Sequence, residues 1–231
     1  MKKITVVIRS IGERTTGLCC DIIRRSGVNP VIVSGLPRAE AVRESYQVGY
    51  DERGDFTIVT DADMIPEPDF VDTMTSCFDG SDALCGLGRF KCFIYGRMRI
   101  GGARIYRTCD LKKIIEAIKD CDRPERGVLT NLGGKYVKAQ KSIGRHAYEQ
   151  YYRDIYRVCF AHGYKMRHEM IIGTAMGIIM RERCHLWFEN RHADKYAQIA
   201  LYGFTAGQSA NSIDAPPFDY DMYKIQELPP L

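Results

Sequence analysis

Three short apolar runs, separated by two segments with helical spacing, constrain the fold of this chain more than any other feature. The runs are ITVVI (Ile4 to Ile8), PVIVS (Pro30 to Ser34) and FTIVT (Phe56 to Thr60), and all are rich in β-branched residues. Such continuous apolar runs are typical of strands buried on both faces of a parallel sheet. Residues 13–26 and 38–50 between them have the apolar spacing of helices. This order, with its short connections, predicts an α/β fold with right-handed crossovers.

Beyond the third run the pattern is less regular. Short helices are expected near residues 68–78 and 111–119. Residues 83–106 are expected to be rich in strands, in a mixed or antiparallel arrangement, whereas residues 120–141 read as a loop. Residues 146–162 have strong helical spacing and predict a longer helix.

Two carboxylates, Asp61 and Asp63, follow directly after the third apolar run. In open α/β sheets, ligands bind at the carboxyl ends of the strands. Mg²⁺ is usually held there by one or two carboxylates together with phosphate oxygens and water. An Asp-x-Asp pair is also common in loops, where Asp63 would simply cap the next helix. The position after a third buried strand favours a cation held against a diphosphate.

The stretch from Ile4 to Val71 resembles the amino-terminal half of family-2-type glycosyltransferases with the GT-A fold. The matching pieces are ITVVIRSIGERT, RAEAVRESYQVGY and FTIVTDADMIPEPDF, of which the last is the most similar. The resemblance implies a GT-A-like, Rossmann-type mixed sheet, mostly parallel and flanked by helices. It also implies one catalytic domain over residues 1–207, with a nucleotide-binding half (1–80) and an acceptor-side half (81–207). Residues 208–231 are expected to form an extended tail.

The same resemblance implies a metal-dependent transfer of a sugar from a nucleotide diphosphate, with Mn²⁺ or Mg²⁺ as cofactor. The donor is expected to be UDP- or GDP-linked. Residues at the matching positions would contact this donor, and they are Arg9, Ser10, Glu13, Arg38 and Asp61. Asp63 would bind the metal directly, and Asp61 would bind either the ribose or the metal.

A third metal ligand in such folds is often a histidine from the carboxyl-terminal half. His146 and His192 are the best candidates, because both stand beside other polar residues at the expected ends of elements. In inverting members of the family that the chain resembles, an acidic residue at the start of a late helix usually serves as the base that deprotonates the acceptor. Glu149 fits that position, although an acid in a first helical turn is equally well explained by the helix dipole.

The acceptor is not identified by the sequence. Six Lys and Arg residues lie between Arg89 and Arg107 with no acidic residue among them. They are either a solvated basic face or a surface that binds anions, which leaves open an anionic acceptor such as a modified nucleic acid. The net charge of +4 is too small to indicate nucleic acid by itself.

Other features narrow the class of protein. The nine cysteines are scattered and contain no CxxC pair, so we expect neither disulfides nor zinc, and a reducing cytoplasm. The most apolar stretch, residues 170–180, is far short of the ~20 residues of a transmembrane helix, so no membrane span is expected. The amino terminus reads as a first strand and not as a signal peptide.

Two other functions remain open. One is a sugar-nucleotidyltransferase, which is disfavoured because no glycine-rich loop with a following Arg and Lys stands after the first strand. The other is a non-catalytic binding module whose acidic pair only caps a helix.

Overall fold

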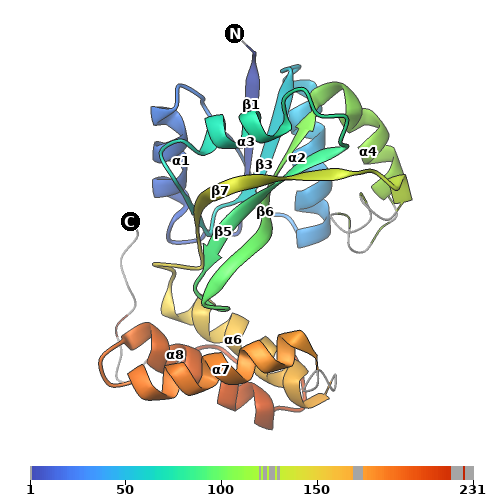
Figure 1. Cartoon of the computed structure of the whole chain (residues 1–231). Helices are drawn as coiled ribbons and strands as arrows, with labels where there is room; N and C mark the ends of the chain where they lie inside the picture. The colour runs from blue at the N-terminus through green and yellow to red at the C-terminus, as the bar shows by residue number, and fades with distance from the viewer. Residues whose placement is uncertain are drawn as a thin grey trace. The chain divides into compact units, whose positions relative to one another are not determined.

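The computed structural model describes residues 2–119, 121, 124, 128, 131–168, 174–219 and 226. The chain divides into two compact units (Figure 1). The first is made of Met1–Cys92 and Met98–Tyr148, and the second of Phe93–Arg97 and Glu149–Pro230. The single catalytic domain expected over residues 1–207 stays a prediction.

A sheet of seven strands forms the centre of the first unit within the described ranges. Its strands lie in the order β2-β1-β3-β6-β5-β7-β4. Their bounds are β1 Ile4–Ser10, β2 Val31–Ser34, β3 Phe56–Asp61, β4 Met64–Pro66, β5 Cys85–Cys92, β6 Arg97–Arg107 and β7 Tyr136–His146. The α/β class and the three strands predicted at the start of the chain are confirmed.

The sheet is mixed but not mostly parallel, and in this respect the prediction was wrong. Strand β1 pairs in parallel with β2 and β3, and β5 pairs in parallel with β7. Strands β3 and β6, and β4 and β7, pair in antiparallel fashion. Helical segments connect β1 to β2 and β2 to β3, as parallel neighbours require. Helices also lie between β4 and β5 and between β6 and β7, whereas the connections from β3 to β4 and from β5 to β6 are only two and four residues long.

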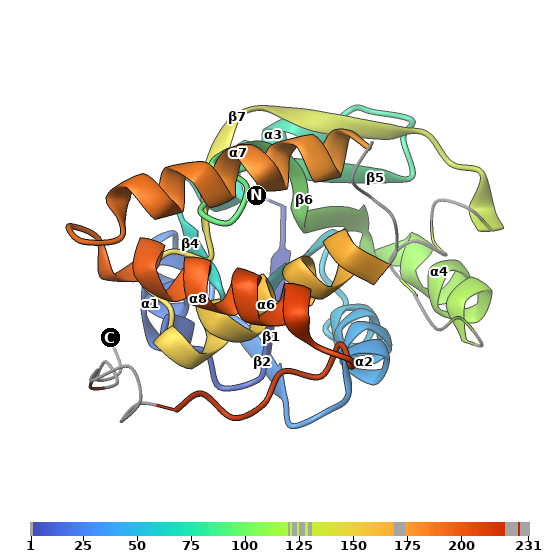
Figure 2. The same cartoon turned by 90° about the horizontal axis from the view of Figure 1, so that it is seen from below.

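Helices cover both faces of this sheet. Figures 1 and 2 show α1 and α3 on one side, and α2 and α4 on the other. Val7 and Val59 of the central strands pack in one buried cluster with Tyr46 of α2 and Leu111 and Ile114 of α4. The bounds of these helices match the sequence prediction closely: α1 Thr16–Arg25, α2 Arg38–Asp51, α3 Phe70–Phe78 and α4 Leu111–Ile118, with a 3-10 turn at Thr108–Asp110 before α4.

Strand β7 lies where the sequence suggested a loop and the start of a helix. His146 is the last residue of β7, and the helix expected from 146 begins only at Tyr152. The strand carries polar residues on both faces, so it lacks the alternation by which a strand is recognised. It forms because β5 and β4 pair with its two edges, which a local pattern does not reveal.

Among the described residues of the second unit, most belong to three helices, which Figure 2 shows side by side. They are α6 Tyr152–His168, α7 Ala175–Asn190 and α8 Lys195–Ser209. Helices α6 and α8 approach closely at glycines: a Cβ on Gly163 would lie 2.0 Å from the Phe204 carbonyl oxygen. Gly207 is equally close to the carbonyl oxygen of Phe160. Side chains at these glycines would push the two helices apart.

The predicted tail begins later than expected, since α8 continues to Ser209. Residues 210–219 contain no helix or strand, and the rest of the tail, except residue 226, lies outside the described residues. None of the helices in the described ranges is long and apolar enough to cross a lipid bilayer.

Candidate functional site

The register of β1 and β3 brings Arg9 and Asp61 together at the carboxyl ends of the two strands. They occupy paired positions in the parallel ladder. Arg9 Nη2 lies 2.9 Å from Asp61 Oδ1, and only 8% of the Arg9 side chain is exposed against 36% of Asp61. The Ala62 amide also donates to the Arg9 carbonyl at 2.9 Å. The Asp-x-Asp turn is therefore fastened to the end of β1.

The loop after β1 is held by the side chain of Glu13. Its Oε2 accepts hydrogen bonds from the Ser10 hydroxyl at 2.7 Å and from the Ile11 amide at 2.8 Å. The Ser10 hydroxyl in turn accepts from the Gly12 amide at 3.0 Å. The two polar residues of this loop that the sequence singled out, Ser10 and Glu13, thus contact each other and shape the loop.

Thr15 belongs to this region but was not singled out from the sequence. Its hydroxyl is fully buried and donates to the Ala62 carbonyl at 2.6 Å. The start of α1 is thereby joined to the turn between Asp61 and Asp63. A threonine just before a helix is commonly an N-cap whose hydroxyl accepts from the backbone of that helix. In the structure the hydroxyl reaches across to another loop instead.

Asp63 and His146 form the second ion pair of the site. Strand β4 pairs with β7 so that Met64 stands opposite His146, which brings Asp63 beside the imidazole. His146 Nε2 lies 3.1 Å from Asp63 Oδ2, and His146 Nδ1 lies 3.2 Å from Cys92 Sγ. The Phe90 ring packs against the imidazole with centroids 5.2 Å apart. Both ring nitrogens of His146 therefore have a partner, and Phe90 packs against the ring.

The electrostatics of this pair favour the doubly charged form. Burial disfavours the charged form of Asp63, but the charge and hydrogen bond of His146, then the charges of Arg9 and Arg38, lower the pKa of Asp63 below its usual value. Burial also disfavours the imidazolium, yet the Asp63 carboxylate and Cys92 raise the pKa of His146 to about 10. At neutral pH the pair is a carboxylate beside an imidazolium.

One oxygen of Asp63 fits a cation. Asp63 Oδ1 is buried, and it has no hydrogen-bond partner in the part of the chain that the structure describes. A buried carboxylate oxygen without a donor costs free energy, which a bound cation would remove. The described residues contain no group of three His, Cys, Asp or Glu side chains placed to hold a metal. The buried carboxylate oxygen, which has no partner among the described residues, fits a hard cation of the Mg²⁺ type, which takes few protein ligands and completes its shell with phosphate and water.

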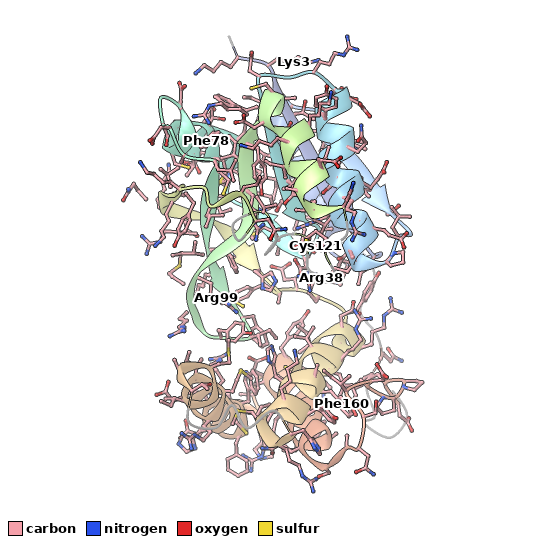
Figure 3. All side chains as sticks on the ribbon, turned by 90° about the vertical axis from the view of Figure 1, so that its right-hand side faces the viewer. Lys3, Arg38, Phe78, Arg99, Cys121 and Phe160 are labelled. Atoms are coloured by element: carbon pink, nitrogen blue, oxygen red, sulfur yellow. The ribbon has the colours of Figure 1, made fainter. Side chains whose placement is uncertain are left out.

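Arg38 begins α2, and its charge contributes to the low pKa of Asp63. Figure 3 shows Arg38 at the opposite end of the first unit from Lys3, which precedes β1. Its side chain is exposed at the same edge of the sheet as the acidic pair. Arg43, one turn further on, donates instead to the Ile118 and Cys121 carbonyls at 3.3 and 2.7 Å. It joins α2 to the end of α4.

The remaining predicted site residues, Glu149 and His192, belong to the second unit. Glu149 precedes α6 by three residues and has a backbone φ of 57°, so it does not lie in a first helical turn as expected. The correction follows from the late start of that helix. His192 is exposed in the turn between α7 and α8. The catalytic role of Glu149 and the ligand role of His192 stay predictions.

Comparisons with known proteins gave matches among solved structures. No protein-family model matches the sequence, and no curated protein sequence matches it. One similar structure is a glycosyltransferase involved in the glycosylation of the major capsid of PBCV-1, with 15% identity over 64% of this chain and 93% of that chain, and a TM-score of 0.45. Another is the mannosyltransferase PcManGT from Pyrobaculum calidifontis in complex with GDP-Man and Mn²⁺, with 12% identity, 91% and 76% coverage, and a TM-score of 0.46. A third is the 4-diphosphocytidyl-2C-methyl-D-erythritol synthase from Anaerococcus prevotii, with 9% identity, 64% and 90% coverage, and a TM-score of 0.45.

Proposed function

We propose that this chain is a metal-dependent glycosyltransferase that moves a sugar from a UDP- or GDP-linked donor to an acceptor. The observation that carries the proposal is the state of Asp63 Oδ1, a buried carboxylate oxygen with no hydrogen-bond donor among the described residues. It lies in a turn at the carboxyl edge of a Rossmann-type sheet, where such sheets bind nucleotides. Positive charge from Arg9 and Arg38 reaches the same carboxylate.

In this proposal each residue has a distinct task. Asp63 holds Mn²⁺ or Mg²⁺ through Oδ1, while Asp61 stays paired with Arg9 and faces the ribose. Arg38, exposed at the start of α2, binds the diphosphate. When bound, the cation stabilises the negative charge that develops on the departing diphosphate.

His146 is the third-ligand candidate that the geometry favours, since its Nε2 already lies 3.1 Å from Asp63 Oδ2. To act as a ligand, Nε2 must lose its proton, because only the neutral imidazole offers a lone pair. The hydrogen bond between Nδ1 and Cys92 then holds the ring with Nε2 directed at the carboxylate.

Two further parts of the molecule have roles in the proposed reaction: the loop after β1, which faces the donor, and Glu149, the general base. Glu13 orders the loop after β1, so its backbone and Ser10 present a fixed edge to the nucleoside. Glu149 is the proposed base for an inverting transfer. Its left-handed backbone is uncommon for a residue other than glycine.

Thermal unfolding tests the proposal directly. UDP- and GDP-sugars should raise the Tm of the wild-type protein in the presence of Mn²⁺, and much less in EDTA. Asp63→Ala should lose the metal-dependent part of this rise. Asp72→Ala, which removes an exposed carboxylate on α3, is the matched control and should behave as the wild type. A protein that responds to none of these nucleotides, or an Asp63→Ala variant with an unchanged response, would refute the proposal.

Product analysis separates the transferase from a sugar-nucleotidyltransferase. Incubated with a nucleotide-sugar, a glycosyltransferase releases nucleoside diphosphate, by transfer or by slow hydrolysis. A nucleotidyltransferase instead releases pyrophosphate from a nucleoside triphosphate and a sugar phosphate. Formation of pyrophosphate alone would replace the proposed reaction with the second one.

A further inference from the structure

Strands β5, β6 and β7 concentrate the positive charge of this chain. Within their bounds they carry nine Lys and Arg residues and no Asp or Glu. Without these nine, the chain has 24 basic residues against 29 acidic ones, and its net charge would be negative. The nine are Arg89, Lys91, Arg97, Arg99, Arg104, Arg107, Lys138, Lys141 and Arg145.

Some of these cations have structural partners. Arg107 donates to the Ala83 carbonyl at 2.8 Å and to the Ser81 carbonyl, and it lies 3.5 Å from Asp110. Lys141 pairs with Asp69. The contacts of Arg107 and Lys141 stabilise the fold, and this accounts for two of the nine basic residues. They do not involve the cations further along β5 and β6.

Three others line a pocket of about 290 Å³ on the first unit. Arg89 of β5, Arg99 of β6 and Lys138 of β7 contribute the charges, and none of the acidic side chains that the structure describes lines it. Figure 3 marks Arg99 on its strand. Arg89 Nη1 donates to the Gln140 carbonyl at 3.1 Å, which fixes the guanidinium between β5 and β7. The pocket is thus built from three adjacent strands and not from flexible surface residues alone.

The chemistry of the lining indicates the ligand. A guanidinium matches a phosphate in a bidentate manner, and a lysine adds a further charged donor. Met98 and Ile100 also line the pocket and are 41% and 44% exposed, so apolar surface stands beside the charges. An anion joined to a carbon skeleton satisfies both parts of the lining better than a bare ion does.

The pocket and the acidic pair share no lining residue. They approach each other at Arg89, which directly precedes Phe90, whose ring packs against His146. Lys138 lies further away, eight residues before His146 along β7. We propose that the pocket binds the phosphate group of an organic phosphate ester. Resting on the proposed function, this ester is the acceptor.

Binding is tested first, in EDTA, by calorimetric titration with glycerol 3-phosphate and with uncharged glycerol. The wild type should bind the ester and not glycerol. Arg89→Gln combined with Arg99→Gln should weaken binding about tenfold or more, which corresponds to about 1.4 kcal/mol. Lys138→Gln should also weaken it, and this variant leaves the hydrogen bond between Arg89 and Gln140 in place. Lys91→Gln is the matched control, because it removes a charge from β5 outside the pocket.

The outcomes are distinct. Equal affinity in the double variant, Lys91→Gln and the wild type would overturn the assignment, as would binding of a single-stranded oligonucleotide without binding of the ester. Vesicles of phosphatidylglycerol, compared with phosphatidylcholine, distinguish a lipid headgroup from a soluble ester as the source of the phosphate. If ester binding depends on Arg89 and Arg99 while no nucleotide-sugar binds, the assignment of the pocket is supported and the transferase proposal is refuted. Loss of donor binding in Asp63→Ala with ester binding intact supports two separate sites.

Discussion

The substitution His146→Gln should lower the stability of the protein strongly, because it breaks the ion pair with Asp63. We expect a larger loss than for the replacement of any other histidine that lies in an ion pair. The change leaves Asp63 without the imidazolium that lies 3.1 Å from its Oδ2. The two side chains are only 26% and 30% exposed, so water cannot fully replace the lost partner. Removing one member of a buried pair leaves a buried charge uncompensated, which typically costs about 3–5 kcal/mol.

The raised pKa of His146 gives a second estimate of how much free energy of unfolding the ion pair contributes. A rise from 6.5 to about 10 corresponds to an upper limit of about 5 kcal/mol, at 1.36 kcal/mol per pKa unit. Partial exposure reduces this value. We therefore expect His146→Gln to lower the free energy of unfolding by about 3 kcal/mol at pH 6.

The loss of unfolding free energy in His146→Gln should become smaller as the pH rises. Because the folded pKa of His146 is raised, the pair's stabilisation is fully present below the unfolded value near 6.5 and is lost as the pH rises through about 10. Because the pKa of Asp63 is lowered, the stabilisation also falls as the medium becomes acidic enough to protonate that carboxylate. The difference between wild type and variant should be largest between about pH 4.5 and 6.5 and should shrink toward pH 10.

Urea unfolding in EDTA, repeated from pH 5 to pH 10, measures this difference. His185→Gln is the matched control, since His185 Nε2 also lies 3.1 Å from a carboxylate, Glu189, but 73% of its side chain is exposed. Exposed pairs contribute about 0–1 kcal/mol, so the control should lose little. A His146→Gln loss no greater than that of the control, or a loss that stays constant from pH 6 to pH 10, would refute the reasoning.

Two further substitutions test how the site is held together. Thr15→Val should lower the free energy of unfolding by about 1–2 kcal/mol and loosen the acidic turn, because the Ala62 carbonyl loses its 2.6 Å donor, whereas Thr15→Ser should retain most of the stability. Gly144→Ala should cost about 2–3 kcal/mol and weaken any Mn²⁺ response, because the new Cβ would lie 2.5 Å from the Ile65 carbonyl oxygen between β4 and β7. Gly80→Ala meets open space at a φ of 71° and should cost only about 1–2 kcal/mol, so equal losses at the two glycines, measured by urea unfolding, would contradict the steric argument.

The amino-terminal half of the fold could be predicted because its signals are local. Each of the first three strands is an apolar run, and the helices between them have clear periodicity. Parallel strands joined by short right-handed crossovers place their carboxyl ends at one edge. The proximity of Arg9 to Asp61 follows from that rule and from the register of β1 and β3.

The position of His146 could not be derived in the same way. The sequence favoured it as a ligand because it stood beside polar residues, and it assigned it to the start of a helix. In the structure His146 ends β7, and it reaches Asp63 only because β4, a strand of three residues, pairs with β7. Strand pairing between segments eighty residues apart depends on packing partners that no window of local sequence contains. The contacts of Cys92 and Thr15 were missed for the same reason.

The two carboxylates of the acidic pair look equivalent in the sequence, and the structure separates them. Asp61 is 36% exposed and has an arginine 2.9 Å away, so much of its charge is already balanced within the protein. Asp63 is balanced on one side only: Oδ2 faces His146, while Oδ1 is buried without a donor in the described residues. A cation gains most where a buried oxygen has no other partner, since no existing hydrogen bond must be broken to bind it. If the pair binds metal, Asp63 is therefore the carboxylate whose replacement should abolish binding, and Asp61 the one whose replacement should chiefly disturb Arg9.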